Sequence, residues 1–360
     1  MDRRAFLKAV ALAPAVATVA RGSSARAGMD ARWRTFEVTT RVEIPNPSGV
    51  TRVWVPLPLA EDTDYHKAVG QTWTGNAGRV NVVRDPRYGA GIVVAEWPAG
   101  VSAPALEVVT RISARDRRVD VTGPARGVTE DPAVLRRYLE ASDLIRTDGI
   151  VEATAREITK AAKTDVEKAR ALYEWIVDNT FRDPKVKGCG LGDIQTMLET
   201  KNLGGKCADL NALFVGFARA VAIPARDVYG IRVADSAEFK SLGKSGDITK
   251  AQHCRAEFYL AGHGWVPVDP ADVRKVVLEE KPGGLPLDDP QVQKARAKLF
   301  GAWEMNWMAY NYAHDLKLPG SPGTPVPFLM YPQAETGDGR RDSLDPEHFR
   351  YTIKSREIAV

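Results

Sequence analysis

Three residues in the middle of the chain have the types and the order that thiol-dependent catalysis needs. Cys207 follows the run Gly204-Gly205-Lys206, and His253 and then Asp269 come further along the chain. A thiolate is a strong nucleophile, an imidazole can act as its base, and a carboxylate can orient the imidazole. The sequence therefore offers a nucleophile, a base and an orienting group, provided that the fold brings them together.

The element expected to position Cys207 is a helix that begins at this residue. Apolar residues repeat at helical spacing after it, namely Leu210, Leu213, Phe214 and Phe217. The helix must end before Ile223-Pro224, because proline disfavours a helical residue before it. Helix N-termini favour negative charge and lower the pKa of a cysteine, and Lys206 could add to this effect. Taken alone, however, a cysteine is most often a small buried hydrophobic residue.

The elements expected to position His253 and Asp269 are the two strands of a hairpin. Alternating residues predict strands over Cys254–Leu260 and Gly264–Val268, joined by the turn Ala261-Gly262-His263. Such a hairpin brings its two ends together, so that Asp269 can accept a hydrogen bond from one imidazole nitrogen while the other faces the thiol. The register stays open, and a β-bulge is one way to bring both side chains to one face. The alternative is a core histidine and a turn-forming aspartate.

The segment before this region predicts a small antiparallel β-sandwich. Between Trp33 and about Arg115 the chain forms short alternating runs, centred on Phe36–Thr40, Val53–Val55, Val80–Arg84, Ile92–Glu96 and Leu106–Ile112. Glycine, proline and aspartate residues then mark a linker over Val121–Asp131. We expect a domain over residues 28–125, a catalytic core over 130–275 and a C-terminal extension over 276–360 that completes the sheet.

Within the core and the tail, further elements are expected. Apolar residues on one face predict a helix over Val166–Asn179, and the strand Arg226–Val233 follows the helix of Cys207. In the tail we expect a helix over Lys294–Trp303 and a closing strand over Phe349–Ile353. Four aromatic residues could line a cleft but more often form sheet core, and these are Trp303, Trp307, Tyr310 and Tyr312.

The first 27 residues have the pattern of an export signal. Arg3 and Arg4 form a twin-arginine pair, Ala9–Ala20 is an apolar run too short to span a bilayer, and Ala25-Arg26-Ala27 is a small-residue cleavage site. An uncleaved anchor is the alternative. Five of the 50 basic and one of the 46 acidic residues lie here, so 45 of each remain after cleavage. No surplus charge then suggests a nucleic-acid partner or a membrane surface.

The combined motifs resemble the transglutaminase-like superfamily of papain-like cysteine enzymes. They comprise the cysteine at a helix start, Ile223-Pro224-Ala225-Arg226, the run from His253 to Tyr259 and the run from Gly264 to Pro270. The resemblance covers roughly Ala133 to Lys275. It implies an α+β fold, with a papain-like transglutaminase core preceded by the small β-sandwich, and a catalytic triad of Cys207, His253 and Asp269.

The resemblance also implies acyl transfer through a thioester, without a cofactor. One oxyanion donor would be the backbone N–H of Cys207. Candidates for the second are Gln195, Asn202 and Trp175, although Trp175 fits a helix core better. Attack by water on the thioester would give hydrolysis, and attack by an amine would give a cross-link.

The other cysteines support no metal site. The sequence holds three cysteines, which cannot all pair within one chain, and no two have the spacing of zinc ligands. Cys254 should point to the face of its strand opposite His253 and into the core. Cys189 lies in a loop-like segment, and a regulatory disulfide with Cys207 is one hypothesis.

These features together predict an exported cysteine hydrolase or amidase that acts on peptide or isopeptide bonds in the periplasm or outside the cell. Cell-envelope polypeptides are plausible partners from the compartment alone, with no nucleic acid and no membrane insertion after cleavage. A protein-cross-linking enzyme is one alternative. A catalytically silent binding or scaffold module of the same fold is another, because fold alone does not settle function.

Overall fold

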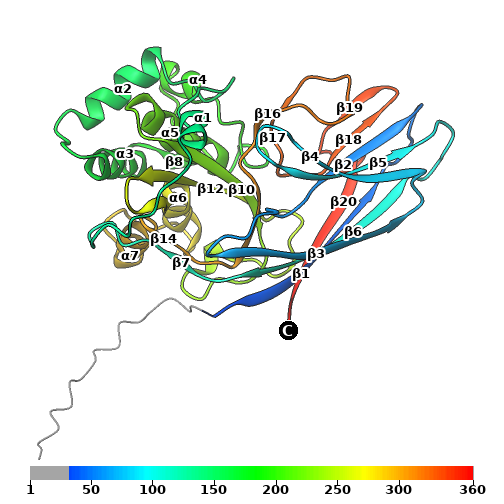
Figure 1. Ribbon diagram of the computed structural model, residues 1–360, viewed down its shortest axis with the longest axis horizontal. Coiled ribbons are helices and arrows are strands. Elements are labelled where there is room, and N and C mark those ends of the chain that lie inside the picture. Colours follow the sequence, from blue (N-terminus) through cyan, green and yellow to red (C-terminus); the bar gives the residue numbers. More distant parts are fainter. Residues whose placement is uncertain (1–31, 360) are drawn as a thin grey trace, which may run out of the picture.

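The computed structural model describes residues 32–359, and it places a helical half beside a β-rich half (Figure 1). The predicted export signal lies outside the described residues. The helical half contains all the α-helices, and the β-rich half is formed by two sheets that face each other (Figure 1). Among the described helices, none has the length and the apolar content needed to cross a membrane.

The β-rich half is an antiparallel sandwich of two five-stranded sheets. Across the first sheet the order is β11 (Gly246–Asp247), β20 (Arg350–Ile358), β1 (Arg34–Glu43), β6 (Ala105–Ala114) and β3 (His66–Gly75). Across the second it is β19 (Gly339–Arg341), β18 (Gln333–Thr336), β2 (Thr51–Pro56), β5 (Gly91–Trp97) and β4 (Arg79–Arg84). Val42, Val53, Val93 and Trp97 pack between the sheets. The alternating runs of the sequence thus form the predicted sandwich.

Both ends of the described chain contribute to this sandwich. The predicted closing strand is β20, which pairs with β1 along its whole length, from Thr35 opposite Ile358 to Glu43 opposite Arg350. Strand β3 was not predicted from the sequence. Nine of its ten residues are exposed, so its side chains lack the alternation that marks a half-buried strand.

The helical half combines a four-stranded sheet with the seven α-helices found within residues 32–359. The sheet order is β13 (Gly264–Val268), β12 (Gln252–Leu260), β10 (Ala225–Arg232) and β15 (Trp307–Asn311). The helices are α1 (Pro132–Arg137), α2 (Gly149–Thr159), α3 (Asp165–Asn179), α4 (Ile194–Glu199), α5 (Cys207–Ala220), α6 (Pro270–Glu279) and α7 (Pro290–Lys298), with a 3-10 helix η1 (Lys240–Leu242). The α+β fold class is therefore confirmed.

Three two-stranded pairs connect these layers. Strand β14 (Ala302–Trp303) pairs with β7 (Arg117–Arg118), and β16 (His314–Leu316) pairs with β17 (Val326–Phe328). The parallel pair of β8 (Phe181–Arg182) and β9 (Gly204–Gly205) lies just before α5. This last pair fixes the segment that leads into Cys207.

Helix α5 is the buried centre of the helical half. Every residue from Cys207 to Arg219 is buried, and the helix packs against the faces of β12 and β10. Helix α3 begins with a capping box, in which the Thr164 side chain accepts from the Glu167 N–H and the Glu167 carboxylate accepts from the Thr164 N–H. Trp303, Trp307 and Tyr310 are buried, which confirms the interpretation of these tail aromatics as core.

Candidate active site

Cys207 is the first residue of α5, and Asp209 holds the segment in front of it in place. The Asp209 carboxylate accepts from the backbone N–H groups of Lys206 at 2.9 Å, Gly192 at 2.9 Å and Leu191 at 3.0 Å. Gly190 has a φ of +91°, and a Cβ atom there would collide with this carboxylate. The loop before α4 is therefore tied to the start of α5, beside the thiol.

The helix start also leaves a backbone donor for an oxyanion. The N–H of Ala208 donates to the carbonyl of Cys189 at 2.9 Å, and that of Leu210 donates to the carbonyl of Lys206 at 3.0 Å. The N–H of Cys207 has no acceptor among residues 32–359. The first N–H groups of a helix lack partners within the helix, so this one is free to stabilise negative charge.

The surroundings of Cys207 favour the thiolate. Its side chain lies within hydrogen-bonding reach of Cys189, Cys254 and His253, and these contacts hold the pKa of the Cys207 thiol well below its usual value, although burial opposes them. The pKa of the Cys189 thiol is raised by its contact with Cys207 and by burial, and burial raises that of Cys254. Of the three thiols, Cys207 is therefore the one that ionises.

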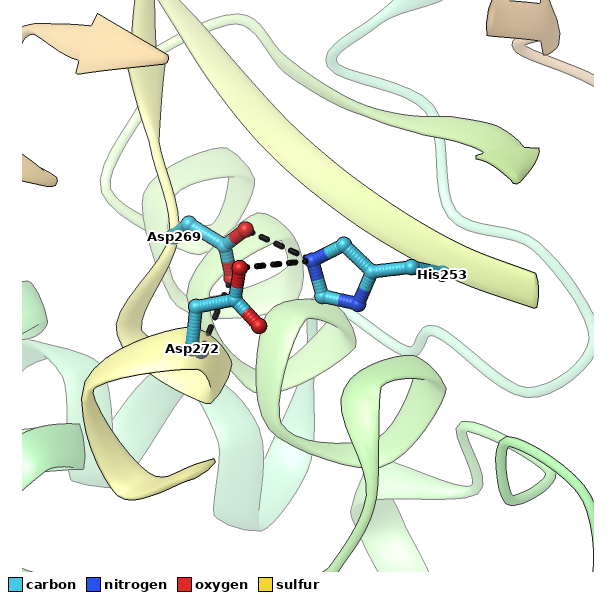
Figure 2. A group of neighbouring side chains, drawn as sticks. All are labelled: His253, Asp269 and Asp272. Carbon is cyan, nitrogen blue, oxygen red and sulfur yellow. Dashed lines mark hydrogen bonds and ion pairs between the residues drawn. The ribbon is translucent and has the colours of Figure 1, made fainter. Parts of the chain in front are cut away.

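The imidazole of His253 is oriented by the start of α6 (Figure 2). Its Nε2 lies 2.8 Å from Oδ2 of Asp269 and 3.3 Å from Oδ2 of Asp272. This leaves Nδ1 for the thiol of Cys207. Burial disfavours the protonated ring, but the carboxylates of Asp272 and Asp269 outweigh it and raise the pKa of His253 to about 10. A thiolate opposite an imidazolium is thus the favoured charge state.

Asp269 is fixed from several sides. It is the N-cap of α6, where Oδ1 accepts from the N–H of Asp272 at 3.0 Å and from the amide of Asn211 at 3.2 Å. The guanidinium of Arg255 lies 3.7 Å from its Oδ2. Burial and the charge of Asp272 raise the pKa of Asp269, and the neighbouring His253 opposes this rise.

The structure brings the three predicted catalytic residues together but places the oxyanion candidates elsewhere. Gln195 is exposed on α4 and donates to Glu199 at 2.7 Å, and the side chain of Asn202 accepts from the N–H of Gly204. Trp175 packs edge-on against Phe217, in the helix core as expected. The identity of a second oxyanion donor therefore stays a prediction.

The remaining cysteines lie beside the nucleophile. All three cysteines are free thiols, so the disulfide between Cys189 and Cys207 stays a prediction. Cys189 donates to the carbonyl of Gln252 at 3.3 Å, and its side chain contacts that of Tyr331. Cys254 is fully buried, as expected, but it also reaches Cys207 because α5 packs against its face of β12.

The C-terminal segment covers this part of the site. Cys207 is only 4% exposed and His253 only 3%. A side chain at Gly188 would meet Tyr331 Oη at 2.8 Å and Leu344 at 2.9 Å, so the segment between β17 and β20 lies against the Cys189 loop. The Cys207 thiol is thus buried, and this segment lies over the loop that contacts it.

Sequence reasoning missed Asn211, Asp272, Arg232, Arg255 and Tyr331, which surround the predicted residues. Asn211 stands in the first turns of α5, where an amide is common for helix-end reasons alone, yet its side-chain amide donates to Asp269. Ligand atoms of His253, Asp269 and Asp272 lie within 4.8 Å of one another, as in a metal site. Two guanidiniums already face these carboxylates, however, so the cluster does not need a cation.

This combination of fold and site defines a papain-like cysteine enzyme core. A family model described as the transglutaminase-like superfamily matches residues 152–270, which include all three predicted catalytic residues. An uncharacterized protein of Haemophilus influenzae is 36% identical over 346 residues, covering 91% of this chain and 92% of that protein. The chain belongs to the transglutaminase-like superfamily.

Solved structures share this fold at low sequence identity. The crystal structure of a putative cysteine protease from Cytophaga hutchinsonii has a TM-score of 0.51 and 15% identity, covering 90% of this chain and 98% of that chain. The periplasmic domain of TgpA from Pseudomonas aeruginosa has 16% identity and covers 73% of this chain and 92% of that chain, with a TM-score of only 0.37. The first of these structures supports the arrangement of both halves of the molecule.

Proposed function

We propose that this protein is an exported, cysteine-dependent acyl-transfer enzyme that hydrolyses peptide or isopeptide amide bonds. The observation that carries the proposal is the contact of 2.8 Å between His253 Nε2 and Asp269 Oδ2, with the imidazole between this carboxylate and the Cys207 thiol. A silent binding module has no physical need for a buried, ionised thiol beside an oriented imidazole.

The reaction follows from the charge state of the site. The Cys207 thiolate attacks the amide carbonyl, and the negative charge that develops on oxygen faces the free N–H of Cys207 at the start of α5. The imidazolium of His253 gives its proton to the leaving amine, and a thioester remains. Neutral His253 then takes a proton from water, which attacks the thioester, and the acid and the thiolate–imidazolium pair are released.

The compartment and the substrates belong to the same proposal. The twin-arginine pattern at Arg3 and Arg4 supports export to the periplasm or beyond, and polypeptides of the cell envelope are then the accessible substrates. A primary amine that reached the thioester before water would turn the same chemistry into cross-linking. The enclosed thiol, 4% exposed, favours water as the acceptor because a second large substrate must also enter.

The test compares the two fates of the thioester. Mature protein is given a glutamine-containing peptide and a labelled primary amine, and both hydrolysis and amine incorporation are measured for the wild type, Cys207→Ala and the control Thr74→Ala, which alters an exposed residue of β3. We expect hydrolysis in the wild type and the control and none in Cys207→Ala. Amine incorporation as the main product would favour the cross-linking alternative. Absence of both, together with slow alkylation of Cys207, would favour the binding module.

A further inference from the structure

The imidazole of His253 faces two carboxylates, although a catalytic triad needs only one. Asp269 and Asp272 stand three residues apart at the start of α6, and their Oδ2 atoms both point at Nε2, at 2.8 Å and 3.3 Å (Figure 2). The N–H of Asp272 donates to Oδ1 of Asp269, so one turn of backbone fixes the two carboxylates relative to each other.

Asp272 has few other partners. Its Oδ1 accepts from Arg232 Nη2 at 2.6 Å, and its Oδ2 is buried with no hydrogen bond within residues 32–359. Arg232 is itself held by the carbonyl of Leu242 at 2.5 Å. A buried carboxylate oxygen without a partner is costly. The cost falls when the nearby Nε2 carries a proton and a positive charge.

The charges around the ring balance only when both aspartates are counted. The charged and titratable groups that face His253 are Cys207 on α5, Asp269 and Asp272 on α6, Arg232 on β10 and Arg255 on β12, with the neutral thiols of Cys189 and Cys254 beyond Cys207. With a thiolate and an imidazolium, three negative charges face three positive ones. Without Asp272, the buried cluster carries an excess positive charge, which disfavours the imidazolium.

We propose that Asp272, held by Arg232, is a second positioning carboxylate that keeps the Nε2 proton on His253 and thereby stabilises the imidazolium opposite the Cys207 thiolate. Asp269 fixes the orientation of the ring through its shorter contact of 2.8 Å and its own hydrogen bonds. Asp272 extends to higher pH the range over which the ion pair exists. This inference rests on the proposed function, because it assumes that Cys207 and His253 form a catalytic couple.

The test is the pH profile of iodoacetamide alkylation at Cys207, located by mass spectrometry, in full mature protein. In the wild type we expect one transition on the acid side, where the thiolate forms, and one on the alkaline side, where the imidazolium loses its proton. In Asp272→Asn the alkaline transition should fall by about one pH unit or more, because the imidazolium loses a neighbouring negative charge, whereas the acid transition should not rise, because the same loss of negative charge favours the thiolate. The matched control is Asp289→Asn, which alters the N-cap of α7.

A second variant covers the case in which Asp272→Asn does not fold. Asp272→Asn combined with Arg232→Gln removes both buried charges together, and the alkaline transition should still fall, by a smaller amount. Unchanged transitions in a folded single or double variant would overturn the inference and leave Asp272 as a structural residue. A wild type without any His253-dependent transition would instead overturn the proposed function, so the two failures are distinguishable.

Discussion

Strand β12 carries two buried charge clusters, and they differ in what they can do. At one end, Glu257 lies between Arg117 and Arg226, with an ion pair of 2.5 Å to Arg226. The Arg226 guanidinium is also 3.9 Å from the rings of both Trp265 and Tyr312. Burial disfavours the charge of Glu257, but Arg226 and Arg117 outweigh it and lower the pKa. None of these charges changes near neutral pH.

The cluster at His253 is also buried, but it contains groups that can exchange a proton. Its imidazole has a pKa raised to about 10 and its thiol has a lowered pKa, so the proton resides on the imidazole, from which it can pass to a leaving group. In the cluster at Glu257, by contrast, Arg117 of β7 donates to the carbonyl of Trp265 on β13 at 2.6 Å. That cluster therefore links the segment after the sandwich strand β6 to the sheet of the helical half. Buried charge is therefore common to both clusters, and what distinguishes the cluster at His253 is a pair of groups that can exchange a proton.

The largest expected effect separates the clusters by activity. His253→Ala should reduce hydrolysis by about 10⁴-fold or more, since it removes the base and the partner of the thiolate. Glu257→Gln, the matched substitution in the other cluster, should change the rate constant by less than about tenfold where the protein is folded. Turnover of the glutamine peptide measures both. Equal losses in the two variants would mean that the clusters do not differ as described.

The free energy of unfolding should depend strongly on the charge of Glu257, although the rate of hydrolysis should not. Glu257→Gln leaves two buried guanidiniums facing a neutral amide, which should lower the free energy of unfolding by about 3–5 kcal/mol. The exposed control Glu43→Gln should change it by less than about 1 kcal/mol. Denaturant unfolding of the three proteins gives these values. A loss below about 1 kcal/mol in Glu257→Gln would show that this cluster does not hold the two halves together.

The pH dependence of stability should reveal the ion pair. The pKa of His253 is raised to about 10, so its contribution is fully present below about pH 6.5 and is lost as pH rises to 10. The pKa of Cys207 is lowered, so its contribution grows up to the unfolded thiol value of about 8.5. The two slopes cancel between about pH 6.5 and 8.5. Above this range the stability should fall by about 1.4 kcal/mol per pH unit.

The difference in unfolding free energy between the wild type and the double variant Cys207→Ala with His253→Ala isolates this pair. A difference that rises below about pH 6.5, stays flat and then falls above about 8.5 supports it. A difference that does not vary with pH would mean that the thiol and the imidazole have the same pKa values in the folded protein as in the unfolded chain.

The smallest expected effect concerns access to the titratable cluster. Tyr331→Ala should raise the alkylation rate of Cys207 by about 2- to 10-fold, because it removes part of the cover over the Cys189 loop and the contact with the Cys189 thiol. Tyr88→Ala, on the sandwich, is the control. An unchanged rate in Tyr331→Ala would place the route to the thiol elsewhere.

The sequence predicted the elements that carry the triad because their signals are local. The cysteine at a helix start, the proline that ends this helix and the turn at Gly262 each depend on neighbours in the chain. The register that lets His253 reach Asp269 could not be predicted. It depends on α6 beginning directly after β13, so that Asp269 becomes a helix cap rather than a strand residue.

The residues that were missed act through contacts between distant segments. Arg232 and Arg255 alternate with apolar neighbours on strands, as exposed residues would, and only the packing of α6 buries them against two aspartates. Asp272 has the appearance of an ordinary acid in a first helical turn. Tyr331 approaches the thiol because β18 and β20 return to the sandwich, which no local pattern reveals.

The most direct test of the ion pair is the ultraviolet absorbance of the Cys207 thiolate as a function of pH, in mature wild type and in His253→Ala, with Cys207→Ala as the blank. We expect a thiolate that forms well below the unperturbed pKa of about 8.5 in the wild type and only near or above it in His253→Ala. A thiol that titrates near 8.5 or higher in both proteins would contradict the ion pair, and with it the catalytic role given to Cys207 and His253.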